Sequence, residues 1–220
     1  YSFRDLIHRY TKGHPWSEFG IDLCLGSKAD QIVGVKEKIF VPIELMLALD
    51  GATLDTKSPT KELSIIFEPD EPTGEKSVWD ILTPLLLFTI IAVIIAGICW
   101  IEYRRRKTFW PIDAILFPLY GIAGCVLTFL AFLSEHPTVS PNYILFLFQP
   151  FHLIFAPYII RGEIKRTRIW YHYLNGVVLS LFLVFLPLIP QNFNFAVVPL
   201  AICLLLRSAT YILIERKNKL

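Results

Sequence analysis

Five long apolar stretches dominate the second part of the chain, separated by short segments that hold most of the polar residues there. A helix rises about 1.5 Å per residue, so about 20 apolar residues cross the ~30 Å hydrocarbon core of a bilayer. Backbone polar groups cannot stay unpaired in lipid, and a run of this length is therefore expected to be helical. The expected transmembrane helices cover residues 81–101, 114–134, 141–160, 169–190 and 193–214.

The segments that follow the first, third and fifth stretches are basic, whereas the other two connections contain no Lys or Arg. The basic residues are Arg104, Arg105, Arg106 and Lys107, then Arg161, Lys165, Arg166 and Arg168, then Arg216, Lys217 and Lys219. Short cytoplasmic segments of membrane proteins collect Lys and Arg. We therefore expect a multi-pass protein of the bacterial inner membrane, with a periplasmic N-terminal region and a cytoplasmic C-terminus.

The first 78 residues show patterns of short helices. Apolar residues at helical spacing predict two helices near the start, and a third is expected from Pro42 to Leu49, which has proline in its first turn and is followed by Asp50-Gly51. Glu62–Phe67 alternates weakly as a strand, and Glu68–Lys76 has the composition of a linker. So few apolar residues make a marginal core, and we expect this region to pack on the membrane helices or on a part outside these residues.

The predicted fold is thus an all-α polytopic membrane protein with five transmembrane helices and a small, mostly helical N-terminal extramembrane region. It has two parts: 1–78, which is the C-terminal part of a periplasmic domain, and 79–220, which is the five-helix transmembrane domain.

Only 18% of the residues are charged, against an average of about 25% in soluble domains. The net charge of +2 is too small to indicate a nucleic-acid partner, so the expected partner is the lipid bilayer.

The cysteines give no sign of a disulfide framework, because Cys99, Cys125 and Cys203 fall inside apolar runs. Cys24 alone lies in the water-facing part, where an isolated cysteine usually acts as a small apolar residue. No spacing of residues matches a metal, phosphate or dinucleotide motif, and no catalytic residue, metal or cofactor is assigned.

His152 is the first candidate for a functional polar residue, because ionisable groups inside a bilayer are expensive and usually have a reason to be there. It lies about 11 residues into the third stretch, roughly 16 Å deep and near the midplane, close to Gln149. Two interpretations stay open: a functional polar site, or a neutral histidine bonded to a neighbouring helix.

Asp113 and Arg207 lie near the inner ends of the second and fifth stretches. Asp113 is at the inner end of its stretch and Arg207 lies about seven residues above the inner end of its own. We expect them to form a structural ion pair. The side chain of Arg207 is also long enough to reach the cytoplasmic interface.

The outer segment between the second and third stretches holds Glu135, His136 and Asn142. Adjacent Glu and His side chains can form an acid–base pair on the side where a periplasmic substrate would arrive. The flanking prolines are equally typical of a tight reversal. Together with Gln149 and His152, these residues form the candidate polar site.

Several segments resemble the Lnb-like family of Gram-negative bacteria. In the N-terminal region these are Phe3–Asp30 and Ile39–Leu54; in the membrane part they are Asp113-Ala-Ile-Leu-Phe, Gly121-Ile-Ala-Gly124, Ser134-Glu-His-Pro137, Asn142 and Gln149-Pro150-Phe-His152-Leu. The membrane part is similar to the family's five-helix domain. The part before it is similar to the end of the family's periplasmic domain.

The resemblance implies that the periplasmic domain is related to papain-like amidases or peptidases. It places the catalytic cysteine in an Asn-Cys segment just before the Arg-Asp motif carried here by Arg4 and Asp5, and therefore upstream of Tyr1. Cys24 does not occupy that place, and Gln149 stands where the family has Asn. The chain starts with Tyr1 and no secretion signal precedes the exported region, so we expect a longer precursor.

Two functions follow. The favoured one is a membrane module that tethers and positions a periplasmic domain and binds a partner protein or a lipid-linked envelope substrate. The alternative is the C-terminal part of a membrane-tethered cysteine hydrolase or transferase acting on envelope material. A transporter is less favoured, because no inverted repeat is visible.

Overall fold

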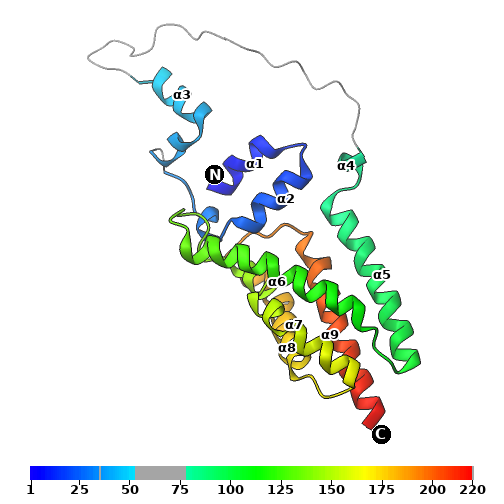
Figure 1. Ribbon diagram of the computed structural model, residues 1–220. Coiled ribbons are helices and arrows are strands. Elements are labelled where there is room, and N and C mark those ends of the chain that lie inside the picture. Colours follow the sequence, from blue (N-terminus) through cyan, green and yellow to red (C-terminus); the bar gives the residue numbers. More distant parts are fainter. Residues whose placement is uncertain (35, 53–77, 220) are drawn as a thin grey trace.

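The computed structural model describes residues 1–34, 36–52 and 78–219, and its regular elements in these ranges are all helices (Figure 1). The only β pairing among them is an isolated bridge between Ser2 and Ile32. The predicted all-α fold is confirmed. The expected strand at Glu62–Phe67 and the linker at Glu68–Lys76 lie outside the described residues.

Within the described ranges, five helical segments are long and apolar enough to cross a membrane, as predicted. They are α5 (Pro84–Arg105), α6 (Trp110–Leu133), η3 (Tyr143–Phe146) with α7 (Pro150–Lys165), α8 (Trp170–Phe185) with η4 (Leu186–Leu188), and α9 (Val197–Lys219). Several of them run a few residues past the expected boundaries. At one end of the bundle α5, α7 and α9 continue through basic residues, because a helix pairs its own backbone groups whether its side chains are apolar or charged.

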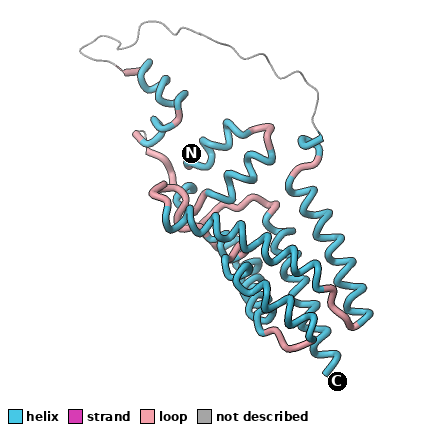
Figure 2. The backbone as a smooth tube through the Cα atoms, in the orientation of Figure 1, coloured by secondary structure: helices cyan, strands magenta, loops and turns pink. Residues whose placement is uncertain are grey.

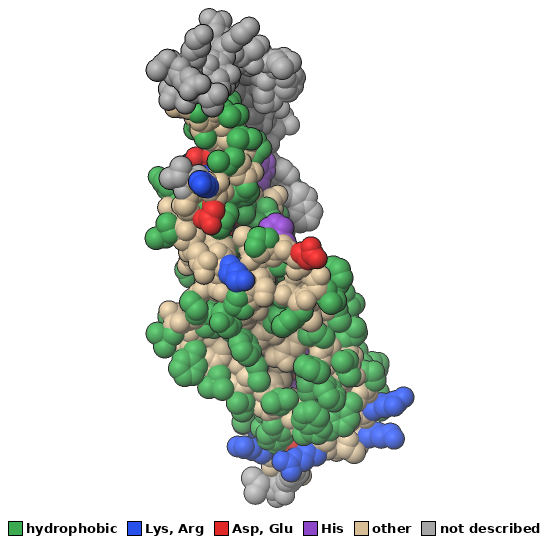
Figure 3. All heavy atoms as spheres, turned by 90° about the vertical axis from the view of Figure 1, so that its left-hand side faces the viewer, with side chains coloured by type: hydrophobic (Ala, Val, Ile, Leu, Met, Phe, Trp, Pro, Cys, Tyr) green, Lys and Arg blue, Asp and Glu red, His purple; other side chains and the backbone are tan. Residues whose placement is uncertain are grey.

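The surface of the bundle divides into an apolar band and a charged end. Figure 3 shows hydrophobic side chains over the middle of the molecule and Lys and Arg side chains gathered below them. We call this the basic end; it contains the α5–α6 and α7–α8 connections and the C-terminus.

Two glycines allow α6 and α7 to approach closely. A Cβ atom at Gly121 would collide with the backbone of Leu153, and one at Gly124 would lie 2.6 Å from the carbonyl carbon of Gln149. Small residues let helix backbones meet in this way inside membranes. The other extensive helix pairs are α5 with α9 and α8 with α9, so α9 contacts helices on two sides of the bundle (Figure 2).

The N-terminal residues 1–31, which we call the head, form α1 (Phe3–Thr11), α2 (Pro15–Cys24) and η1 (Ser27–Asp30). The first helix starts with a capping box in which Ser2 and Asp5 exchange hydrogen bonds. The bonds donated by Ser2 lower the pKa of the Asp5 carboxyl. Beyond the head lie η2 (Glu37–Phe40), the expected third helix α3 (Pro42–Asp50), and α4 (Val78–Ile81).

The head packs on the bundle, in addition to a small apolar cluster that Leu6 forms with Val33 and Val41. Phe19 is buried in the same apolar cluster as the membrane helices and lies 5.2 Å, ring to ring, from Phe88 of α5. The indole of Trp16 donates a 2.9 Å hydrogen bond to the carbonyl of Leu82. Apolar burial therefore joins the two regions, and we call this side of the bundle the head end.

Candidate functional site

The structure does not bring the residues of the predicted polar site into one group. Glu135 and His136 are exposed between α6 and η3, where Nδ1 of His136 lies 2.9 Å from the hydroxyl of Thr138. Gln149 donates to the carbonyl of Phe146. Asn142 is buried and turned toward the head, because its side chain caps the turn at η3 and bonds the carbonyl of Leu23.

His152 is fully buried and both of its ring nitrogens have partners. Nε2 lies 3.0 Å from the carbonyl of Leu147, and Nδ1 lies 2.8 Å from the hydroxyl of Tyr171 on α8. A neutral imidazole that donates from Nε2 and accepts at Nδ1 satisfies both bonds. This geometry supports the interpretation in which the histidine is bonded to a neighbouring helix.

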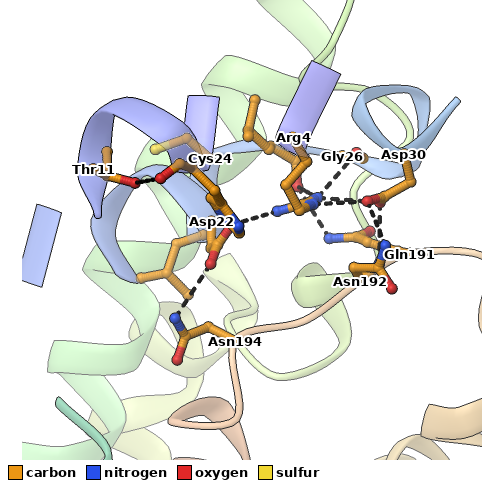
Figure 4. A network of polar contacts seen from close by, with 12 residues as sticks. Arg4, Thr11, Asp22, Cys24, Gly26, Asp30, Gln191, Asn192 and Asn194 are labelled. Carbon is orange, nitrogen blue, oxygen red and sulfur yellow. Dashed lines mark hydrogen bonds and ion pairs between the residues drawn. The ribbon is translucent and has the colours of Figure 1, made fainter. Parts of the chain in front are cut away.

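A polar network joins the head to the bundle, with Arg4 at its centre (Figure 4). Its guanidinium is buried and bonds Asp22 and Asp30, each with one contact of 2.7 Å. Burial disfavours the charge of Arg4, but the hydrogen bonds from its guanidinium to Asp30 and Asp22 raise its pKa above the ordinary value. Arg4, from the Arg-Asp motif, thus organises the head.

The bundle completes this network from the connection between η4 and α9. Asn192 bonds both carboxylate oxygens of Asp30, at 3.0 Å from its backbone nitrogen and 2.9 Å from its side chain. Asn194 donates to Asp22, and Gln191 donates to the carbonyl of Leu25. The same carboxylates therefore hold Arg4 on one side and the bundle on the other (Figure 4).

Backbone contacts fix the head from a second direction. The amides of Gly26 and Ser27 donate to the carbonyls of Thr138 and Pro141, at 2.9 and 2.8 Å. A Cβ atom at Gly26 would collide with the carbonyl of Pro141, so this approach requires glycine.

Cys24 is the cysteine of the head, and its environment is that of an unreactive thiol. It is half-buried, and burial raises the pKa of its thiol, so the thiolate nucleophile is disfavoured.

A second polar site lies near the basic end, where each of the five membrane segments contributes one ionisable residue. We call this group the five-helix cluster; its members, in the order of α5 to α9, are Glu102, Asp113, Glu163, His172 and Arg207. All five residues are buried.

Arg207 pairs with Asp113 through two hydrogen bonds, of 2.8 Å from Nε and 2.6 Å from Nη2. Its Nη1 pairs with Glu102. The side chain is 1% exposed, so it does not extend to the interface, although it is long enough to do so. The two carboxylates of α5 and α6 hold it inside.

Three members of this cluster are absent from the expectations drawn from the sequence. Glu102 and Glu163 stand beside basic segments, where they resemble interfacial residues, and His172 stands among aromatic residues at the start of its span. The available signal was that each of the five spans has an ionisable residue in the half that lies toward the basic end.

Two hollows accompany these sites. A groove of about 550 Å³ lies between the head-end halves of α5 and α9. Its lining is aliphatic except for Thr89 and Phe195, and includes Ala92, Ala96 and Ile202. A pocket of about 790 Å³ at the basic end is lined by Arg106, Lys107, Arg166 and Arg168, with Glu163 and Tyr211.

Comparison with protein families identifies the membrane part. The model of the Lnb transmembrane domain matches residues 75–219. No curated protein and no solved structure matches the chain. Residues 1–74 lie outside the matched range, so their assignment to a periplasmic domain stays a prediction.

Proposed function

This chain belongs to the Lnb transmembrane-domain family, and we propose that it is a membrane module that fixes an exported N-terminal region in one orientation on the bilayer surface. The observation that carries the proposal is the network around Arg4, in which Asp22 and Asp30 bond both the head and the bundle. A single helix with a linker would suffice to anchor a domain. Specific hydrogen bonds to two connections of the bundle are needed only where orientation matters.

The proposed orientation places the head in the periplasm and the basic end in the cytoplasm of a bacterial inner membrane. Support comes from the segments at the two ends, since Arg104–Lys107 and Arg161–Arg168 are rich in Lys and Arg, whereas 134–140 and 190–194 contain neither.

We further propose that the module binds a lipid-linked envelope substrate by its acyl chain in the groove between α5 and α9. Its lining residues Leu85, Val93 and Phe195 are exposed on the apolar surface of the bundle, so an occupant is expected to arrive from the bilayer. Its walls are almost wholly apolar, which suits a hydrocarbon chain and gives no partner to a polar one. It lies in the head-end half, which places a bound headgroup beside the head.

Positioning is tested by Gly26→Leu, which forces the head away from the carbonyl of Pro141. Hydrogen–deuterium exchange in lipid nanodiscs is expected to rise at Gly26, Ser27 and the start of α1, with the membrane helices unchanged. Gly20→Leu is the matched control, because a Cβ atom there meets nothing within 4 Å. Unchanged exchange of the head in Gly26→Leu would mean that these contacts do not hold it.

Orientation is tested by cysteine accessibility in a Cys24→Ser background. We expect a membrane-impermeant maleimide to label Glu135→Cys in intact spheroplasts, and to label Lys165→Cys only after lysis. Both positions are exposed, so labelling reports the side of the membrane. The reverse pattern would overturn the proposed topology.

Acyl-chain binding is tested by Ala96→Trp, which fills the groove from an exposed position. A phospholipid with a photoreactive acyl chain is expected to label the wild-type groove and to lose that labelling in the variant. Ile94→Trp is the control on the same helix, exposed but outside the lining. Equal labelling of both variants would exclude a specific acyl site there.

The alternative function, a membrane-tethered papain-like amidase, peptidase or transferase with its cysteine upstream of Tyr1, is favoured by one contact in the head. Nε2 of His8 lies 2.8 Å from Asp22, and the His8 side chain is 32% exposed. A carboxylate that orients a partly exposed histidine is the arrangement of a general base in triad enzymes. In the full-length protein, labelling of the upstream cysteine by an active-site thiol probe should depend on His8; equal labelling in His8→Gln would exclude this role.

A further inference from the structure

Three side chains of the five-helix cluster converge on one point. The carboxylates of Asp113 and Glu163 and a ring nitrogen of His172 lie within 4.8 Å of one another, and all three residues are buried. They come from α6, α7 and α8, so the convergence depends on the packing of the bundle.

Two of these side chains lack hydrogen-bond partners among the described residues. Neither carboxylate oxygen of Glu163 has a hydrogen-bond partner there, and Nε2 of His172 has none either. Both side chains are 0% exposed. The two groups face each other at 3.8 Å, which is too long for a hydrogen bond. Buried polar atoms are nearly always paired, so these three atoms are suited to a ligand held between the side chains.

The charges of the cluster are also unbalanced. Glu102, Asp113 and Glu163 carry three negative charges when ionised, and Arg207 supplies one positive charge. Excess charge inside a membrane protein is strongly unfavourable. A divalent cation between Asp113, Glu163 and His172 balances the remaining two charges.

The imidazole of His172 is held in the manner of a metal ligand. Its Nδ1 lies 3.3 Å from the hydroxyl of Ser208, which also accepts a 2.9 Å hydrogen bond from Asn175. When Nδ1–H is donated to Ser208, Nε2 presents its lone pair to Glu163. The ring of Tyr211 stacks on the imidazole at 4.4 Å and fixes its plane. Metal-bound histidines typically have such a partner on the second ring nitrogen.

We propose that Asp113, Glu163 and His172 bind a divalent transition-metal cation such as Zn²⁺. With metal–ligand distances of about 2.0–2.2 Å, tetrahedral ligand atoms lie about 3.4 Å apart, so the observed 3.8 Å needs only a small rotation of side chains. An imidazole with two carboxylates suits Zn²⁺ or Mn²⁺ better than Mg²⁺ or Ca²⁺, which prefer oxygen alone. The basic-end pocket, whose lining includes Glu163 and Tyr211, lies beside the site.

The test is metal analysis of the purified chain in nanodiscs, after EDTA treatment, addition of Zn²⁺ and removal of free metal. It uses a His8→Gln background, because His8, Glu18 and Asp22 form a second group with ligand atoms within 4.8 Å. About one Zn²⁺ per chain is expected. Glu163→Gln and His172→Gln should each weaken binding at least about tenfold, whereas His136→Gln, at an exposed position, should not.

A second measurement separates metal binding from misfolding. In EDTA, Glu163→Gln should unfold at the same temperature as the parent or higher, because it removes an unbalanced carboxylate. Added Zn²⁺ should raise the unfolding temperature of the parent and leave that of Glu163→Gln unchanged. Co²⁺ should give the parent visible d–d absorption. Less than one tenth of a Zn²⁺ per chain, or full binding by Glu163→Gln, would overturn the proposal; Glu163 would then balance its charge with a proton.

Discussion

Replacement of Arg207 by methionine tests whether the five-helix cluster stabilises the bundle. Methionine keeps much of the volume and apolar stem of arginine and removes the guanidinium. Asp113 then loses two hydrogen bonds and Glu102 loses one, and both carboxylates stay buried without a positive partner.

The expected loss is large. Removal of one partner from a buried ion pair costs about 3–5 kcal/mol, because the remaining charge is left uncompensated. A hydrogen bond to a charged group contributes about 1.5–3 kcal/mol, and three are lost here. We therefore expect a loss of at least about 4 kcal/mol, which for a chain of 220 residues lowers the unfolding temperature by about 8–16 °C.

The assay is the fraction of monodisperse protein after heating in detergent, with EDTA present so that bound metal does not contribute. Arg161→Met is the matched control, since this arginine is exposed on α7. The triple variant Glu102→Gln, Asp113→Asn, Arg207→Met should recover most of the lost stability, because it removes every charge of these pairs together. If Arg207→Met unfolds within 2 °C of Arg161→Met, the reasoning from buried charge is refuted.

Three further predictions concern packing, a buried bond and pH. Gly121→Leu should separate α6 from α7 and lower the unfolding temperature, whereas Gly97→Leu should have little effect, because a Cβ atom at Gly97 meets nothing within 4 Å; equal effects would contradict the close approach. Tyr171→Phe should cost about 1–3 kcal/mol, because it leaves Nδ1 of His152 unpaired, and an unchanged unfolding midpoint would argue against this bond. The depressed pKa of Asp5 means that its capping box stabilises α1 above the ordinary Asp pKa and loses this effect as the pH falls through the lowered value; the protection factors of the α1 amides, corrected for the intrinsic exchange rate at each pH, should therefore fall on acidification in the wild type, but not in Asp5→Asn.

The number and length of the membrane helices could be predicted from the sequence, because the hydropathy of a span is a local property. The short helices at Phe3–Thr11 and Pro42–Asp50 were also accessible, since apolar spacing and a first-turn proline specify them locally. The exact ends of the helices were harder to predict from the sequence, because α5 and α7 continue into basic residues. Such residues end an apolar run without ending a helix.

The depth of a residue in the membrane could also be predicted by counting along its span, and the position of Asp113 and Arg207 toward the same end suggested that they pair. The rotation of each helix about its axis could not be predicted in this way. That rotation, set by close packing such as α6 against α7 at Gly121, turns Glu163 and His172 toward Asp113 and turns Asn142 toward the head, away from Glu135 and His136. Counting along one helix therefore decided how deep each polar group lies, and contacts between helices distant in sequence decided which of these groups meet.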